Sequence, residues 1–232
     1  VNIAVGSNLM DQKWAADLMR LNKSFIIPRS GSSKREIYRS LNLVSEFILN
    51  KVEVEHESIW IAQREGRAKD GKDLTDPAIL KMIHLVKRKE RSISDFFNQI
   101  RVVPVSISYE FDPNDLNKAK EVYEAEVNGY YQKKENEDLE SISRGISGFK
   151  GSVVLNIGNV MNFKSDSYED VAEQITNEIS NQFHNHSTNK DALSILNEDL
   201  KLEDNEYFSK RLKDQSDEVK SILLSQYANS AN

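Results

Sequence analysis

The chain has 232 residues, of which 38% are apolar and 29% charged, a composition that suits one sizeable core and argues against a membrane bundle or a fully disordered chain. The apolar runs fall far short of the roughly 18 to 20 residues that a membrane-spanning helix needs. The absence of cysteine excludes disulfides, cysteine-based zinc sites and thiol nucleophiles.

The formal net charge of -6 is unevenly distributed. Residues 1–110 hold 18 Lys and Arg against 14 Asp and Glu, a net +4, whereas the remaining residues carry a net -10. This asymmetry favours an anionic partner for the first half and a solvated acidic surface for the second.

The first elements follow from apolar spacing and capping signals. Residues 2–5 are a short apolar segment, 11–21 show helical spacing, and 24–27 indicate a buried strand. Ser33 to Glu36 match a capping box, which predicts a helix that begins near Lys34.

The middle of the chain alternates strands and helices. Residues 58–62 predict a second strand, and Asp76-Pro77 predicts the start of a helix. Residues 101–109 give the strongest strand signal, in which Pro104 indicates an edge, a start or a bulge. A further helix is expected over 112–131.

Residues 133–141 are rich in Lys and Glu and indicate a solvated connection or helix surface, 151–157 predict a fourth strand, and helical patterns fill most of the chain after Tyr168. We therefore expect an α/β fold, with a mixed, largely parallel sheet flanked by helices and a helical C-terminal extension. The expected domains are 1–165 and 166–232.

Two basic loops follow predicted strands. Arg29 lies among hydroxyl side chains in 28–35, and 63–69 contain Gly66, which allows close backbone approach. Ligands of open α/β sheets bind at the carboxyl ends of the strands, so we expect the loops to share one rim and hold a phosphate. Residues 31–34 lack the second glycine and the Gly-Lys-Ser/Thr ending of a P-loop.

Simpler interpretations of these loops stay open. Arg29 is also compatible with an ordinary salt bridge, and Glu65-Gly66-Arg67 with a turn that contains an internal ion pair.

Three segments resemble, in order, motifs two, three and four of the glycerolphosphate acyltransferase family. They are Phe25-Ile26-Ile27-Pro28-Arg29, Glu65-Gly66-Arg67 and Val103-Pro104-Val105-Ser106-Ile107-Ser108-Tyr109-Glu110, and the resemblance runs from about Asn2 to Gly158. It implies transfer of a fatty acyl group from acyl-CoA or acyl-carrier protein to glycerol 3-phosphate or lysophosphatidate.

The resemblance also implies the site. Arg29 and Arg67 would bind the phosphate of the acceptor, Glu65 and Gly66 would shape its pocket, and Pro104 would lie in the strand beside the acyl group. Arginine suits a phosphate dianion, and a carboxylate can orient arginine or accept from a glycerol hydroxyl. No metal or bound organic cofactor is implied, since the thioester is a cosubstrate, and the expected location is the cytoplasmic face of a membrane.

The family's general base is a histidine in a His-x-x-x-x-Asp motif, which deprotonates the acceptor hydroxyl. We expect this motif, and the native start, upstream of Val1, so no catalytic residue is assigned within the chain. His186 and Asp191 have the same spacing, but we expect a coincidental surface sequence. His56 is expected to be exposed and His84 to be packed and hydrogen-bonded.

Two other functions stay open. One is a non-catalytic module that binds anionic lipid or phosphate through the same rim. The other is a nucleic-acid-binding domain that uses the basic first half, but the sequence shows no aromatic-basic interleaving and no recognition-helix motif, so no nucleic-acid partner is expected.

Overall fold

The computed structural model describes residues 1–7, 13–28, 33–66, 68–134 and 136–230. The chain forms two compact units. The first unit comprises Val1–Gly66, Leu74–Pro104 and Asn159–Glu178. The second unit comprises Arg67–Asp73, Val105–Gly158 and Ile179–Asn232.

A small parallel sheet forms the centre of the first unit. Its strands are β1 (Asn2–Gly6), β2 (Ser24–Ile27) and β3 (Ile59–Trp60), in the order β2-β1-β3. All three are parallel, with Gly6 opposite Ile27 in one pair and Ile3 opposite Trp60 in the other. The predicted strand over 58–62 is thus confirmed but shorter.

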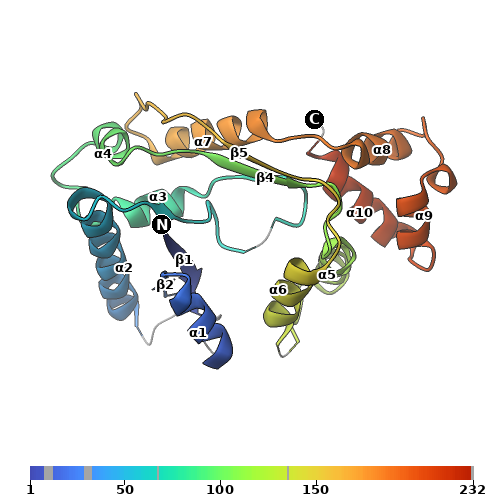
Figure 1. The fold of residues 1–232 in the computed structure, drawn as a ribbon, viewed down its shortest axis with the longest axis horizontal. Coiled ribbons are helices and arrows are strands. Elements are labelled where there is room, and N and C mark those ends of the chain that lie inside the picture. Colours follow the sequence, from blue (N-terminus) through green and yellow to red (C-terminus); the bar gives the residue numbers. More distant parts are fainter. Residues whose placement is uncertain (8–12, 29–32, 67, 135, 231–232) are drawn as a thin grey trace. The chain divides into compact units, whose positions relative to one another are not determined.

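Helices cover this sheet. Helices α1 (Lys13–Leu21) and α2 (Lys34–Leu49) both pack on β2, and Figure 1 shows them on opposite sides of the strands. The capping signal is confirmed, because the Ser33 hydroxyl accepts from the backbone N–H of Glu36 at 3.2 Å. The helix is prolonged by a π-helical turn, Asn50–Val54.

The rest of the first unit is helical, with α3 (Pro77–Ile83), α4 (Ile93–Ile100) and most of α7 (Tyr168–Gln182). Asp76 caps α3 as predicted, since its carboxylate accepts from the N–H of Ala78 at 2.8 Å. Phe96, Phe97 and Phe163 are almost completely buried and form an edge-to-face aromatic core.

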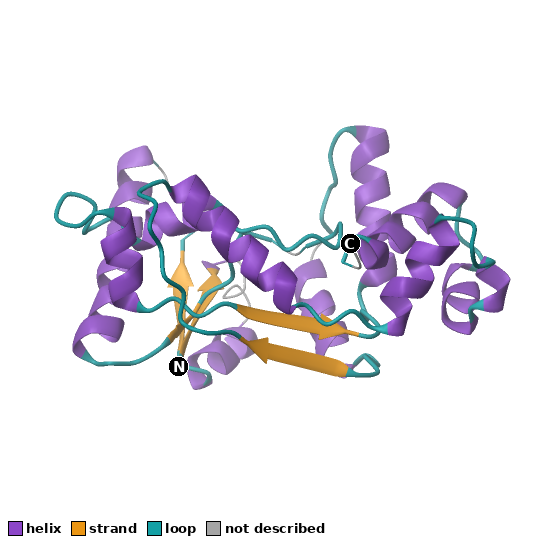
Figure 2. Cartoon of the chain, turned by 90° about the horizontal axis from the view of Figure 1, so that it is seen from above, coloured by secondary structure: helices purple, strands orange, loops and turns teal. Residues whose placement is uncertain are grey.

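The second unit combines an antiparallel ribbon with helices. Strands β4 (Val105–Tyr109) and β5 (Val153–Ile157) pair with each other, and Figure 2 shows them as two long neighbouring strands. The helices are α5 (Asp115–Asn128), α6 (Glu137–Ser147), α8 (Ser187–Leu196), α9 (Glu206–Leu212) and α10 (Asp217–Ala228), with a short 3₁₀ turn at Leu202–Asp204. Phe208, Leu212 and Leu223, all fully buried, lie in their core.

The mixed α/β class is therefore confirmed, with a small parallel sheet and helices around it. The two later predicted strands do not extend that sheet but form a separate antiparallel pair. The strand expected over 101–109 begins at Val105, so Pro104 immediately precedes it. This start suits proline, which has no N–H for the ladder. Helix α6 covers part of residues 133–141, the segment expected to be a solvated connection or a helix surface.

Candidate functional site

The carboxyl edge of the parallel sheet is the strongest candidate site. The chain passes from central β1 to β2 on one side and then crosses to β3 on the other side. Strand order therefore reverses between β1 and β3, and open α/β sheets bind ligands at such a switch point. Because the strands are parallel, the segments after β2 and β3 leave from the same edge.

The β2 side of this edge leads into a helix N-terminus. Pro28 follows β2 and is half-buried, and Ser33 caps the 16-residue α2. Lys34 and Arg35, both exposed, lie in its first turn. Helix N-termini and basic side chains both attract anions. Arg29 lies outside the described residues.

The β3 side is fixed by contacts with the start of α3. The carbonyl of Gln63 accepts from the N–H of Asp76 at 2.9 Å, and its side-chain oxygen accepts from the Thr75 hydroxyl at 3.2 Å. Glu65 and Gly66 follow and are exposed. Gly66 has a φ of +83°, a conformation that favours glycine, and open space surrounds the position of a Cβ. Arg67 lies outside the described residues.

Pro104 takes a different place from the one expected. It is buried, but it lies before β4 rather than within a strand. Strand β4 pairs with β5, so it does not belong to the parallel sheet that carries the other motif residues. The structure thus brings the segments after β2 and β3 to one edge, and it gives the Pro104 strand to a separate ribbon.

His84 is packed as predicted. It is 1% exposed, its Nδ1 lies 2.9 Å from the Tyr168 hydroxyl, and its ring stacks on Phe96 with centroids 4.4 Å apart. Burial lowers the pKa of His84, and the Arg91 backbone opposes this only in part. A buried, hydrogen-bonded imidazole of this kind has a structural role. His56 is exposed, as expected.

The surface location expected for His186 is wrong. His186 is only 5% exposed and begins α8, where its N–H donates to the side-chain oxygen of Asn189 at 2.8 Å. Asp191 accepts from Asn205 at 2.9 Å instead. Within the described part of the chain, no hydrogen bond or ion pair joins His186 to Asp191, so their spacing does not form a catalytic pair.

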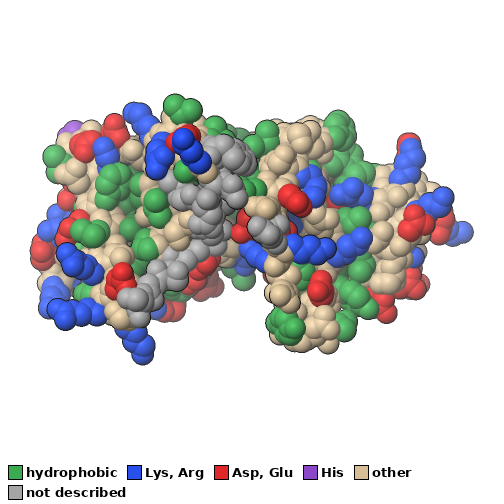
Figure 3. Space-filling view, turned by 90° about the horizontal axis from the view of Figure 1, so that it is seen from below, with side chains coloured by type: hydrophobic (Ala, Val, Ile, Leu, Met, Phe, Trp, Pro, Cys, Tyr) green, Lys and Arg blue, Asp and Glu red, His purple; other side chains and the backbone are tan. Residues whose placement is uncertain are grey.

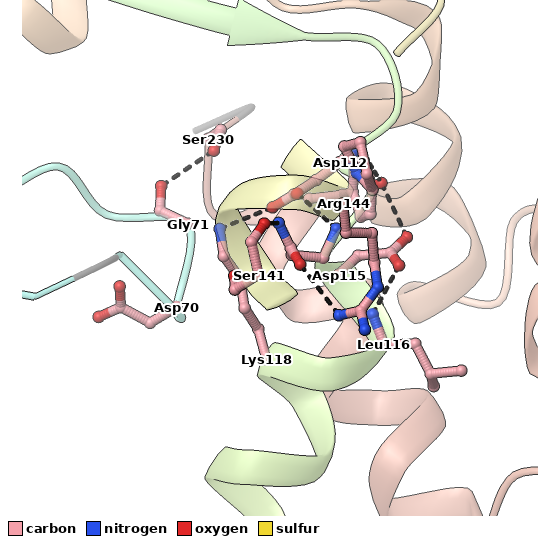
Figure 4. A network of polar contacts seen from close by, with 12 residues as sticks. Asp70, Gly71, Asp112, Asp115, Leu116, Lys118, Ser141, Arg144 and Ser230 are labelled. Atoms are coloured by element: carbon pink, nitrogen blue, oxygen red, sulfur yellow. Dashed lines mark hydrogen bonds and ion pairs between the residues drawn. The ribbon is translucent and has the colours of Figure 1, made fainter. Parts of the chain in front are cut away.

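The second unit contains a buried carboxylate that the sequence did not single out. Asp115, in the first turn of α5, is completely buried. One carboxylate oxygen accepts from the Tyr207 and Tyr227 hydroxyls at 2.6 and 3.0 Å, and the other accepts from Arg211 Nε at 2.9 Å and Nη2 at 2.5 Å. Figure 4 shows Asp115 and Leu116, with Asp112 and Arg144 nearby. Asn114 joins the last two, since its N–H donates to Asp112 at 2.8 Å and its side-chain oxygen accepts from Arg144 at 3.2 Å.

All hydrogen-bond acceptor sites of the Asp115 carboxylate are occupied. The N–H of Leu116 adds a fifth donor to Asp115, whereas a carboxylate offers about four acceptor sites. Burial and the Asp115 charge raise the pKa of both Tyr207 and Tyr227, so both phenols stay protonated donors. Burial opposes the charge of Arg211, but Asp115 outweighs it and the pKa of Arg211 is raised. Asp115 has no free lone pair for proton transfer and acts as a structural anchor.

A cavity of about 230 Å³ lies between α5 and α6. Its walls mix cations with carboxylates, among them Lys120, Arg144, Glu124 and Glu140. Tyr131 donates to Glu137 at 2.7 Å on one wall, and burial, followed by this bond, raises the pKa of Tyr131. The lining therefore carries charges of both signs and selects no particular ligand.

The described residues also have features that concern metal ions, surface charge and membranes. Across the described ranges, no three His, Asp or Glu side chains form a group that could hold a metal ion. On the coloured part of the face in Figure 3, Lys and Arg side chains lie beside Asp and Glu side chains. Among the helices described, none is both long and apolar enough to cross a bilayer.

Comparison with models of protein families and with curated proteins gives no match for the chain. The carboxyl edge of β2-β1-β3 therefore stands as the candidate site on its geometry and on the motif residues that flank it.

Proposed function

We propose that the chain is an acyltransferase that binds a glycerol-phosphate acceptor. It moves a fatty acyl group from acyl-CoA or acyl-carrier protein to glycerol 3-phosphate or lysophosphatidate. One observation carries the proposal. Strands β2 and β3 lie on either side of β1 and are parallel to it, so the chain leaves β2 and β3 at the same edge of the sheet. The segment after β2 completes the resemblance to motif two, and the segment after β3 contains the resemblance to motif three.

The proposed chemistry uses two arginines and a carboxylate. Arg29 and Arg67 bind the phosphate of the acceptor, since guanidinium groups form paired charge-assisted hydrogen bonds with phosphate oxygens. Glu65 orients an arginine or accepts from a glycerol hydroxyl, and Gly66 leaves room for close approach. A free hydroxyl of the acceptor attacks the carbonyl carbon of the acyl thioester. A C–O bond forms, the C–S bond breaks, and the hydroxyl proton passes through a general base to the leaving thiolate.

Acceptor binding tests the proposal directly, because it needs no general base. Calorimetric titration of the 232-residue chain with glycerol 3-phosphate should show saturable binding, whereas glycerol without phosphate should not bind. Arg29→Ala and Arg67→Ala should each weaken binding by about 10-fold or more, as expected for loss of a hydrogen-bonded ion pair.

The matched control is Arg20→Ala, which removes an exposed arginine of α1 that pairs with Asp17. It should bind as the parent does. Unchanged affinity in both Arg29→Ala and Arg67→Ala would remove the basis of the proposal.

Turnover separates an enzyme from a binding module. Palmitoyl-CoA and acceptor are supplied to protein that carries the His-x-x-x-x-Asp pair, and CoA release is measured. Release that depends on acceptor and is lost in Arg67→Ala supports transfer. Acceptor binding without CoA release indicates the non-catalytic module instead.

A further inference from the structure

The β4–β5 ribbon exposes its apolar side. Cross-strand pairs join Val105 to Ile157, Ile107 to Leu155 and Tyr109 to Val153. Directly opposed residues of an antiparallel pair lie on the same face. We name these six residues the apolar ribbon face.

Five of the six side chains are exposed, Ile107 at 36%, Tyr109 at 39%, Val153 at 48%, Leu155 at 52% and Ile157 at 69%, and Val105 is half-buried. The amphipathic pattern is therefore the reverse of that of an ordinary half-buried strand, in which the apolar side packs on the core.

The opposite face of the ribbon carries three polar residues, Ser106, Ser108 and Asn156, together with Val154. Ser106 and Ser108 are each 2% exposed. The Ser106 hydroxyl donates to the carbonyl of Gln182 at 3.1 Å, and the side-chain amide of Asn156 donates to the same carbonyl at 2.5 Å. These hydrogen bonds hold the polar side inward at the end of α7, so the apolar side stays outward.

Two more apolar side chains precede the strand at its Gly151 end. Ile146 is 70% exposed and Phe149 is 78% exposed, and Phe149 stacks on Phe111 with ring centroids 5.5 Å apart. An aromatic side chain presents roughly 150–250 Å² when free and an aliphatic one less, so the face and these two residues leave on the order of 600 Å² uncovered. This area lies at the upper end of the roughly 300–600 Å² that the largest apolar patch of a typical monomer exposes.

We infer that the apolar ribbon face binds the same face of a second copy of this chain. Two such surfaces would bury about 1,000 Å² or slightly more in total, which reaches the lower limit for a specific interface. The six side chains carry no charge, so two copies related by a two-fold axis meet without like-charge repulsion. Such an isologous contact needs only one self-complementary surface.

The charges at the Gly151 end disfavour an anionic lipid surface as the occupant. The ammonium group of Lys150 already donates to the carbonyls of Ile146 and Gly148, at 3.1 and 2.9 Å. The carboxylate of Glu110 lies at the same turn, where it accepts from the N–H of Ser152 at 2.8 Å. Attraction to anionic headgroups needs available cations beside the apolar patch.

The test is the solution mass of the full chain and of Leu155→Lys, measured by sedimentation equilibrium. The parent should give twice the 26.6 kDa of one chain. Leu155 lies at the centre of the face, and each copy of the dimer would bury one introduced ammonium group, so the dissociation constant should rise by about 100-fold or more.

Val127→Lys is the matched control, because Val127 is 63% exposed on α5 and gains the same charge away from the face. It should keep the parent's dimer. Circular dichroism of both variants verifies the fold, which an exposed lysine should leave intact. A parent that stays monomeric, a Leu155→Lys protein that dimerises as the parent does, or a monomer that co-sediments with phosphatidylglycerol vesicles would each overturn the inference.

Discussion

The Asp115 anchor gives the sharpest stability prediction, through the substitution Asp115→Asn. The change keeps the shape of the side chain and removes its charge. Asp115 is completely buried, whereas the Arg211 side chain is 34% exposed. The substitution therefore leaves a guanidinium group without its carboxylate and turns one acceptor into an NH₂ donor that faces other donors.

The magnitude follows from the exposures of the two partners. Removal of one partner of a buried ion pair costs about 3–5 kcal/mol. The exposed third of Arg211 is still solvated, which lowers that cost, while the two tyrosine hydroxyls lose a charged acceptor. We expect the free energy of unfolding to fall by about 3 kcal/mol.

The assay is urea unfolding followed by near-UV circular dichroism of the tyrosines, because Tyr207 and Tyr227 contact Asp115 directly. With a urea slope of about 2 kcal/mol per molar, the midpoint should fall by about 1.5 M. Tryptophan fluorescence reports the first unit separately, since Trp14 and Trp60 both belong to it.

Asp217→Asn is the matched control, because Asp217 is 94% exposed and pairs with Lys220 near the start of α10. Its effect should stay within about 0.5 kcal/mol. If Asp115→Asn shifts the midpoint no more than Asp217→Asn does, the five hydrogen bonds to Asp115 do not stabilise the second unit and the reasoning fails.

Two further stability predictions concern His84 and Gly71. Burial lowers the pKa of His84, so the imidazole stays neutral in the folded protein, whereas the unfolded chain binds a proton below about pH 6.5. Lowering the pH below that value should therefore lower the free energy of unfolding, by at most about 1.4 kcal/mol per pH unit, until the lowered pKa of the folded state is reached. Urea midpoints at pH 7.5 and 5.5 measure this, and a slope that persists in His84→Gln argues against it. Gly71 has a φ of +73°, and a Cβ there would lie 2.0 Å from the Gln226 carbonyl oxygen. Gly129 has a similar φ of +76°, but open space surrounds its Cβ position, so Gly129→Ala should lower the free energy of unfolding by roughly 1 kcal/mol. Gly71→Ala should lower it by several times that amount. Equal midpoints for the two glycine variants would contradict that geometry.

Local signals predicted the helix starts well. Ser33 and Asp76 each satisfy a backbone N–H a few residues along the chain, so their role depends on neighbours that the sequence shows directly. The same logic applies to Ser92, whose hydroxyl accepts from the N–H of Asp95 at 3.2 Å at the start of α4, a helix that was not predicted. A capping signal was thus present there and was overlooked.

Parallel pairing in the first unit was also predictable, because strands that alternate with helices need crossover connections. The partner of β4 was not. Strand β5 begins more than 40 residues later, and alternation separates two faces without deciding which one packs. Here the Gln182 carbonyl draws Ser106 and Asn156 inward, a contact between distant segments that strand patterning does not encode.

The Asp115 anchor was hidden for the same reason. Tyr207, Arg211 and Tyr227 are some 90 to 110 residues away in sequence, and none forms a recognisable spacing with Asp115. Buried charge networks arise from tertiary packing. A single sequence shows their members as ordinary polar residues on three separate helices.

The two functional proposals depend on different residues and can fail separately. The segment that resembles motif four overlaps β4, which also carries half of the apolar ribbon face, so a substitution on β4 would not separate the two proposals. Leu155 lies on β5, outside every motif residue assigned to the acceptor. Leu155→Lys should therefore weaken the dimer and leave glycerol 3-phosphate binding unchanged, whereas Arg67→Ala should weaken glycerol 3-phosphate binding and leave the dimer unchanged. If each substitution abolished both properties, the acceptor would bind only to the dimer, and the assignment of its site to residues of one chain would be wrong.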